Sequence, residues 1–178
     1  EKTRIGKACA ALVTAGQVII LDSGTTTFKI AENISSKRLT VLTNNIFIAF
    51  ELLRWRVISV ILLGGVLYEA SIPMTGALTE STLRAVKNVE IAFISCSAIG
   101  KDGTVYNDYA PEITIKRAMM KAAKRAILVA DSSKLGLSGA IPLASLDDFD
   151  QLITSSSKLT ESIVEDLTKS TKIQINQV

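Results

Sequence analysis

The residues best suited to chemistry form one short run, Asp22-Ser23-Gly24-Thr25-Thr26-Thr27. Apolar residues 18–21 before it predict a buried strand, and the spacing in residues 28–34 predicts a helix that begins near Thr26. The first N–H groups of a helix lack partners within it, and with the helix dipole they favour an anion, most often a phosphate. Gly24 would let the backbone approach this anion, and the threonine hydroxyls would donate to its oxygens. An ordinary N-cap is the alternative role.

Polar or glycine motifs also follow the other predicted strands. They are Thr43-Asn44-Asn45, Gly64-Gly65, Gly100-Lys101-Asp102-Gly103 and Asp131-Ser132-Ser133-Lys134. Each motif is weak alone, because such residues commonly form turns. In an open parallel sheet, however, the carboxyl ends of the strands share one edge, where such folds bind ligands. We therefore predict one composite small-molecule site, which adds to the loop the residues Thr43, Asn44, Gly64, Gly65, Asp102 and Gly103.

Two lysines are candidates for the positive charge that a phosphate requires. Lys134 ends the last of these motifs, and Lys116 lies in the first turns of a helix that Pro111 begins. The alternative for either is an ordinary solvated lysine. Asp22 and Asn44 suit the hydroxyls of a sugar, because a carboxylate accepts hydrogen bonds and an amide both donates and accepts them.

The elements that must position these residues alternate along the chain. Strands are predicted at 18–21, 39–42, 57–63, 91–95, 126–130, 151–154 and 172–175, with a short segment of unassigned type at 141–143 and a short strand or loop at 67–74. Helices are predicted at 2–13, from 26, at 46–53, 80–86, 111–124 and 160–167, and a turn-rich loop at 98–108. The recurrence of strand, polar loop and helix predicts an α/β fold, a mostly parallel sheet flanked by helices on both faces.

Composition limits the function classes. A chain of 178 residues, 48% hydrophobic and 21% charged, suits a single domain over residues 1–178. The net charge of +3 is scattered, with no run of Lys or Arg that would give a DNA-binding face. The absence of histidine excludes imidazole ligands, His triads and His general bases. We expect no cofactor and no metal.

The cysteines and apolar runs bear on location. Cys9 and Cys96 stand in apolar contexts without metal-ligand spacing, which fits reduced thiols in a cytoplasmic protein. The longest apolar run, residues 57–67, is interrupted by Gly64-Gly65 and is too short to span a bilayer, so no membrane partner is expected. The chain opens without an initiator Met, and we expect an N-terminal portion to precede it.

Taken in order, the motifs resemble the C-terminal effector-binding domain of the DeoR family of bacterial transcriptional repressors. They are Glu1-Lys2-Thr3-Arg4-Ile5, Leu21-Asp-Ser-Gly-Thr-Thr-Thr, Val41-Leu-Thr-Asn-Asn, Leu63-Gly-Gly, Ala92-Phe-Ile, Ile115-Lys-Arg-Ala-Met and Ala130-Asp-Ser-Ser-Lys. The resemblance covers essentially the whole chain. One departure is Ser95-Cys96, where members usually have glycine and alanine after Phe-Ile.

The resemblance implies a fold of the ribose phosphate isomerase, glucosamine phosphate deaminase and CoA-transferase type. It also implies a sugar-phosphate effector, a homo-oligomer, and operator DNA bound only through a helix-turn-helix domain upstream of Glu1. The strongly apolar composition agrees with a surface that another copy covers. On this interpretation the chain senses a phosphorylated sugar and relays its binding to the DNA-binding domain, without catalysis.

The alternative is a sugar-phosphate isomerase or deaminase on the same sheet. Residues 100–104 resemble the Gly-x-Asp-Gly-His segment of glucosamine phosphate deaminases, but Thr104 stands where their catalytic histidine would be. A carboxylate could instead move the proton, and the candidates are Asp22, Asp102, Asp108 and Glu112. Each has a simpler role as a hydroxyl acceptor or helix-start residue, so we favour a sensor. A third possibility is an assembly module with a vestigial pocket.

Overall fold

The computed structural model describes residues 1–34, 36–67, 73–155 and 161–178. Its helices are α1 (Lys2–Ala11), α2 (Thr25–Asn33), α3 (Ile46–Leu53), α4 (Ala77–Ala85), α5 (Ala110–Ala122) and α6 (Glu161–Ser170), with short 3-10 turns η1 (Ser132–Lys134) and η2 (Leu146–Asp148). Its strands are β1 (Val18–Leu21), β2 (Leu39–Thr43), β3 (Ile58–Leu62), β4 (Val89–Ser95), β5 (Ala98–Ile99), β6 (Thr104–Asn107), β7 (Ala123–Ala130), β8 (Ile141–Ser145), β9 (Gln151–Thr154) and β10 (Gln174–Gln177).

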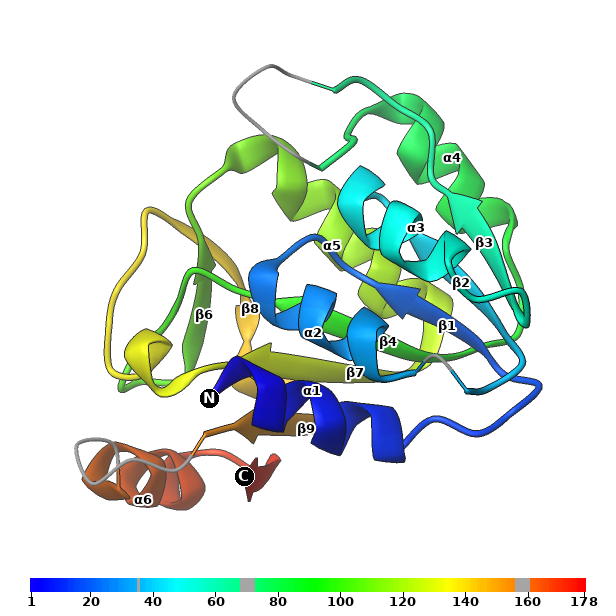
Figure 1. The fold of residues 1–178 in the computed structure, drawn as a ribbon. Helices are drawn as coiled ribbons and strands as arrows, with labels where there is room; N and C mark the ends of the chain where they lie inside the picture. Colours follow the sequence, from blue (N-terminus) through cyan, green and yellow to red (C-terminus); the bar gives the residue numbers. More distant parts are fainter. Residues whose placement is uncertain (35, 68–72, 156–160) are drawn as a thin grey trace.

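The main sheet has seven parallel strands in the order β10-β9-β7-β4-β1-β2-β3. Helices α1, α2 and α3 pack on one face, and α4, α5 and α6 pack on the other (Figure 1). Successive residues of β1 serve opposite faces, so Ile19 and Leu21 join one core while Ile20 joins the other. Burial on both faces explains why the central strand β1 is a continuous apolar run. The predicted α/β fold is confirmed.

The strand order reverses at β1. The chain places β2 and β3 on one side of β1, then crosses over so that β4 pairs with the other side of β1. Such a reversal opens a crevice between two neighbouring strands at their carboxyl ends, and ligands of open α/β sheets bind there. The ends of β1 and β4 are therefore the place to look for a site.

A second, antiparallel sheet of β5, β6 and β8 was not predicted. Residues 98–108 were predicted to form a turn-rich loop, which is wrong for β5 and β6. In β6, residues Thr104 to Asn107 alternate between half-buried and buried, and Val105 packs in the same core as Leu143 of β8. Strands of two and four residues carry too little periodicity to be distinguished from a loop.

Several boundaries moved by a few residues. The helix predicted from residue 80 begins at Ala77, directly after Gly76, whose φ is +105°. The last strand lies at Gln174–Gln177, two residues later than predicted. The strand or loop predicted at 67–74 and the helix start predicted at Thr160 lie partly outside the described residues. Among those described, no helix is long and apolar enough to cross a membrane.

Candidate functional site

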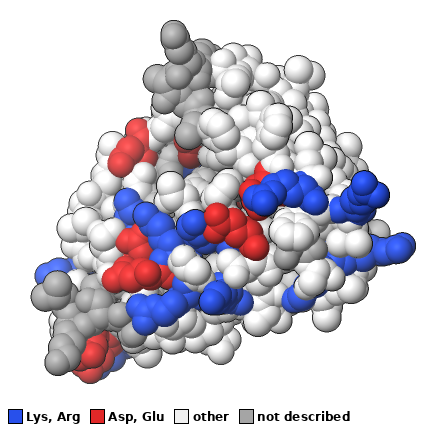
Figure 2. All heavy atoms as spheres, in the orientation of Figure 1, with Lys and Arg blue, Asp and Glu red and all other residues white. Residues whose placement is uncertain are grey.

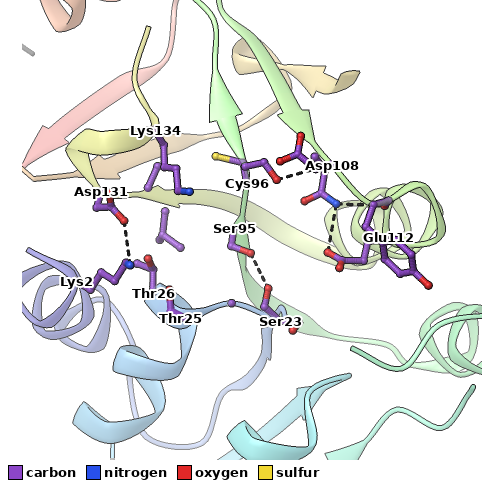
Figure 3. A pocket seen from close by; sticks show the side chains of 16 residues that line it. Lys2, Ser23, Thr25, Thr26, Ser95, Cys96, Asp108, Glu112, Asp131 and Lys134 are labelled. Atoms are coloured by element: carbon purple, nitrogen blue, oxygen red, sulfur yellow. Dashed lines mark hydrogen bonds and ion pairs between the residues drawn. The ribbon is translucent and has the colours of Figure 1, made fainter. Parts of the chain in front are cut away.

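A pocket of about 270 Å³ lies at the carboxyl ends of β1, β4 and β7. It occupies the crevice that the strand reversal at β1 opens. The N-termini of α2 and α5 border it, and the first turn of α1 reaches it as well (Figure 3). Five of the predicted site residues line it, namely Ser23, Gly24, Thr25, Thr26 and Lys134.

The predicted anion loop forms one wall of this pocket. Helix α2 begins at Thr25 with Gly24 as its N-cap residue, and no side chain caps its first N–H groups. These groups are therefore available to a ligand, as an anion-binding helix terminus requires. Thr25 is exposed, and Thr26, although largely buried, also lines the pocket.

Two residues of the loop have structural roles that the sequence did not reveal. Thr27 is fully buried, and its hydroxyl lies 2.6 Å from Asp22 O and 2.9 Å from Gly24 O, so it closes the loop and does not line the pocket. A Cβ on Gly24 would lie 2.7 Å from Ser95 Oγ. Gly24 is thus required by the close approach of β4, whatever it contributes to an anion.

Asp22 and Lys116 form a buried ion pair behind the pocket. Each side chain is 1% exposed, and Lys116 Nζ donates to Asp22 Oδ2. The backbone N–H of Ser95 donates to the same oxygen at 2.9 Å, and the Ser95 hydroxyl lies 2.7 Å from it. Lys116 was predicted to meet the ligand, but here its ammonium is directed to Asp22 and it does not line the pocket. Asp22 is likewise outside the lining of the pocket.

The same lysine connects this pair to the pocket wall. Lys116 Nζ lies 3.1 Å from Ser95 O and 3.5 Å from Glu112 Oε2, and Glu112 lines the pocket. Burial alone would lower the pKa of Lys116, but the carboxylates of Asp22 and Glu112 outweigh it and raise this pKa. Lys116 therefore stays an ammonium near neutral pH and cannot act as a general base.

The wall formed by β6 and α5 presents hydrogen-bond acceptors and donors. Asn107 Nδ2 donates to Glu112 Oε2 at 3.3 Å, and burial raises the pKa of Glu112. Asp108 and Ser97 line the same wall, where the Asp108 N–H donates to Ser97 Oγ at 3.1 Å. Glu112 and Asp108 were predicted only as possible bases, and Asn107 and Ser97 were not predicted as site residues. Asn107 ends β6, a strand that was not predicted, and Ser97 lies between β4 and β5, so no sequence motif marked either residue.

The opposite wall carries the cations. Lys134 and Lys2 both line the pocket, and Lys2 Nζ lies 3.5 Å from Asp131 Oδ2. Burial alone would raise the pKa of Asp131, but hydrogen bonds from Ser133 and the charges of Lys2 and Lys134 lower it. Figure 3 shows Lys2, Asp131 and Lys134 on one side of Ser95 and Cys96, with Asp108 and Glu112 on the other. Nothing in the sequence linked Lys2 to this site.

The motifs after β2 and β3 lie outside the lining of this pocket. Thr43 Oγ1 accepts from Asn45 N at 3.1 Å, and Asn44 Nδ2 donates to Met74 O at 3.1 Å. Gly64 O accepts from the hydroxyl of Thr79. These contacts make Thr43 and Asn44 supports for the next segments, although Asn45 Nδ2 donates to Ser23 Oγ at 2.8 Å and so braces the anion loop.

Gly65 is required by packing. Its φ is +153°, and a Cβ there would lie 2.5 Å from Thr75 O. Because the backbone of residue 75 cannot easily withdraw, a side chain at position 65 would clash. Gly64 and Gly65 therefore shape the chain after β3, and neither lines the pocket.

Asp102 and Gly103 form a turn outside the pocket, in which Asp102 is exposed and Gly103 is buried. Asp102 accepts from Thr104 N at 3.0 Å and from Thr104 Oγ1 at 2.9 Å, and Gly103 has φ +80°. This segment was predicted to meet the ligand, but here neither residue lines the pocket and the Asp102 carboxylate binds its own turn. The segment that resembles glucosamine phosphate deaminases thus lies outside the pocket.

Cys96 lines the pocket as a protonated thiol. Burial raises its pKa to about 12, so the thiolate that nucleophilic catalysis needs is scarce near neutral pH. Within residues 1–34, 36–67, 73–155 and 161–178, no cluster of three or more acidic or cysteine side chains is placed to hold a metal ion.

Solved structures share this fold. A probable sor operon regulator from Shigella flexneri superposes with a TM-score of 0.59 at 14% identity, over 92% of this chain and 85% of that one. Ribose 5-phosphate isomerase A from Neisseria gonorrhoeae superposes with a TM-score of 0.54 at 14% identity, over 75% of this chain and 52% of that one. At such identities the likeness concerns the fold alone.

Curated relatives are regulators of transcription. YulB of Bacillus subtilis, an uncharacterized HTH-type transcriptional regulator, is 36% identical over 156 residues, which are 88% of this chain and 60% of the relative. The transcriptional repressor AccR of Agrobacterium fabrum is 31% identical over 173 residues, 95% and 67% of the two chains. The glycerol-3-phosphate regulon repressor of Haemophilus influenzae is 28% identical over 158 residues, 86% and 60%.

This chain therefore spans about 60% of the length of two of these relatives and 67% of the third. The model of a family described as the DeoR C terminal sensor domain matches residues 1–156. This match includes every residue named above as lining the pocket. The chain belongs to the DeoR C terminal sensor domain family.

Proposed function

We propose that this domain binds a phosphorylated sugar in the pocket and relays its binding to a helix-turn-helix domain that precedes α1 in a transcriptional repressor. The observation that carries the proposal is the division of one pocket into two chemically different walls (Figure 3). One wall joins an uncapped helix N-terminus to lysine side chains, and the other joins carboxylates to an amide. A phosphate suits the first wall and sugar hydroxyls suit the second.

The phosphate wall combines three kinds of donor. The N–H groups at the start of α2, the hydroxyls of Thr25 and Thr26 and the ammonium of Lys134 all border the same space. Hydrogen bonds to a charged group contribute about 1.5–3 kcal/mol each, so two or three of them give a phosphate a large share of the binding free energy.

The hydroxyl wall supplies groups that recognise a polyol. The Glu112 carboxylate accepts from Asn107 Nδ2 through one oxygen, which leaves its other lone pairs for ligand hydroxyls. Asp108 adds a second carboxylate and Ser97 a hydroxyl. A sugar held here with its phosphate at α2 would span the pocket from β7 to α5.

The proposed role is sensing without turnover. The regulator relatives support it, as does the absence of a histidine for ring opening. Glu112 is the carboxylate with the raised pKa that an isomerase would need, so turnover must be tested directly. Thermal-shift screening of glucose 6-phosphate, fructose 6-phosphate, ribose 5-phosphate and glycerol 3-phosphate should find a stabilising compound. NMR should recover that compound unchanged, and its conversion would favour the enzyme alternative.

Substitutions at the two walls should have different effects. Lys134→Met should weaken the stabilising sugar phosphate about tenfold or more and leave the free sugar unaffected, because one charged donor to the phosphate is lost. Glu112→Gln should weaken both compounds by similar factors, because it lies on the hydroxyl wall. Calorimetry measures the affinity of each variant for the sugar phosphate and for the free sugar. Lys101→Met, at an exposed lysine outside the pocket, is the control. If Lys134→Met weakened both compounds equally, Lys134 would not contact the phosphate.

We expect the isolated domain not to bind operator DNA specifically. In Figure 2, the Lys and Arg side chains on this face are interspersed with Asp and Glu, so the field they produce is weak. Gel-shift titration of the domain at physiological salt, beside the full-length protein, measures this. A specific complex of the domain alone, weakened by added salt, would assign DNA contact to this part of the chain.

We further propose that the domain forms a homo-oligomer through an α3–β3 surface, defined by Phe47, Phe50 and Leu53 of α3 and Leu62 of β3. All four side chains are exposed, Phe50 by 68%. Residues 47, 50 and 53 follow helical spacing, and β3 is the end strand of the sheet, so the apolar stripe continues onto an open edge. Such a surface fits a second copy of the chain across a symmetric interface.

Phe50→Asp should convert the oligomer to monomer at micromolar concentration, because it buries a carboxylate against apolar side chains in each partner. Leu137→Asp is the matched control, since Leu137 is 52% exposed and lies between η1 and β8, outside both α3 and β3. Sedimentation velocity distinguishes the species. An oligomer that persists in Phe50→Asp would place the interface elsewhere.

A further inference from the structure

The first two residues of this chain are tied to the ligand pocket. Lys2, in the first turn of α1, lines the pocket, and its ammonium lies 3.5 Å from Asp131 Oδ2 (Figure 3). Asp131 also lines the pocket, three residues before Lys134. The helix that would continue towards the DNA-binding domain therefore has a charged contact inside the site itself.

Glu1 attaches the same turn to the ends of two strands. Its carboxylate accepts from Ser132 N at 3.2 Å, from Ser132 Oγ at 2.9 Å and from Ser155 Oγ at 2.8 Å. Ser155 is fully buried and also accepts from Ser132 N at 3.0 Å. Because Ser132 follows β7 and Ser155 follows β9, the start of α1 is held against the edge of the sheet that binds ligands. We call Glu1, Lys2, Asp131, Ser132 and Ser155 the α1 clamp.

An anion in the pocket changes the charge balance of this clamp. Asp131 Oδ2 is buried and has no hydrogen-bond partner among the described residues, and the positive charges that compensate it are the Lys2 ammonium at 3.5 Å and Lys134. A phosphate at α2 and Lys134 attracts the same ammonium and repels the Asp131 carboxylate. Because Lys2 lies in the first turn of α1, a change of its ion-pair partner acts on that turn.

We propose that the α1 clamp reads the anionic group of the ligand: phosphate competes with Asp131 for Lys2, breaks their ion pair and shifts the first turn of α1. The free sugar lacks the charge that competes, so it leaves the clamp closed. This inference rests on the proposed function, because the shift is a signal only if α1 leads to a DNA-binding domain. The differential contact that allostery requires is the Lys2 pairing in the two states.

The first test follows the movement in the domain itself. Amide hydrogen exchange over the first turns of α1 should change when millimolar inorganic phosphate or the stabilising sugar phosphate is added, and should not change with the free sugar. Lys2→Met should abolish this response, Lys2→Arg should retain it, and Lys7→Met, an exposed lysine of the same helix, should leave it unchanged. Ligand-induced protection confined to α2 and η1, with α1 unaffected, would overturn the clamp.

The second test uses the full-length regulator and its operator. An allosteric ligand typically changes the affinity for a second ligand by about 5- to 150-fold. We expect the sugar phosphate to change the operator affinity of the wild type by a factor in this range. Glu1 is exposed and does not line the pocket, so Glu1→Ala should fold and bind the sugar phosphate with an affinity within about twofold of wild type. In this variant the sugar phosphate should no longer change the affinity for the operator, so the ratio of operator affinities without and with ligand should fall towards one. Ser155→Ala removes the hydroxyl that donates to Glu1, so it should also keep sugar-phosphate binding and lose the effect on operator affinity.

The outcomes separate the inference from the proposed function. If calorimetry detects no sugar phosphate on the wild type, the proposed function fails and the clamp fails with it. If the wild type binds and responds, but Glu1→Ala and Ser155→Ala respond equally well, the proposed function stands and the clamp is overturned. Retained binding with a lost response in both variants is the result that the clamp predicts.

Discussion

Replacing Lys116 by methionine should destabilise the folded domain by about 3–5 kcal/mol, because breaking a buried ion pair from one side leaves an uncompensated charge. Lys116 and Asp22 are each 1% exposed, so water cannot replace the lost partner. The Ser95 N–H and hydroxyl would remain as donors to Asp22, but they supply no full positive charge. Methionine keeps the length and apolar stem of lysine, which limits the change to the ammonium.

Urea unfolding at neutral pH measures this effect, as a lower midpoint at an unchanged m-value. Lys121→Met is the control, because Lys121 is an exposed lysine of the same helix and should change stability by about 0.5 kcal/mol or less. The double variant Asp22→Asn, Lys116→Met should regain part of the loss, since no isolated charge is then buried. A change below about 1 kcal/mol in Lys116→Met would show that the pair is not maintained in solution.

The fold could be predicted because its signals are local. Strands buried on both faces are continuous apolar runs, and each is followed by a polar loop and a helical pattern, so the α/β class follows from the sequence. The antiparallel sheet was missed for the opposite reason. The strands β5 and β6 have two and four residues, and β8 pairs with β6 across more than thirty residues of chain, which no local pattern reveals.

The site could be predicted only in part, because strand order is not encoded locally. The sequence places every polar motif at one edge of the sheet, but not which strand ends are neighbours across the crevice. β1 reverses the order towards β4, so Ser23, Gly24 and Lys134 meet at the pocket while Asn44 and Gly65 support other segments. Residues predicted after β1 and β7 line the pocket, and those predicted after β2 and β3 do not.

Side-chain direction was the other missing information. Lys116 and Glu112 are four residues apart on α5, and either could have faced the ligand. In the structure Glu112 reaches the pocket wall, whereas Lys116 points beneath it to Asp22. The departure at Ser95 has a physical role, since its hydroxyl lies 2.7 Å from both Asp22 Oδ2 and Ser23 O and so joins β4 to the anion loop.

The domain should prefer a phosphorylated sugar to the same free sugar by at least about a hundredfold, since two charge-assisted hydrogen bonds of about 1.5–3 kcal/mol each would be lost with the phosphate. The loss of binding free energy should exceed the sum of the hydrogen bonds that the phosphate makes, because its donors are then left without an acceptor. Without the phosphate, the N–H groups at the start of α2 face the pocket uncapped, and Lys134 has no anion in the ligand to bind.

Calorimetry with the stabilising sugar phosphate and its free sugar measures the ratio directly. Inorganic phosphate should compete with the sugar phosphate for the α2 wall, and equimolar chloride is the matched control for ionic strength. The phosphate-bound domain should still admit the free sugar, because Glu112 and Asp108 lie on the other wall of the pocket. Equal affinity for the two sugars, or no competition by phosphate, would mean that the loop at residues 22–27 is an ordinary helix cap and that the ligand is recognised by its hydroxyls alone.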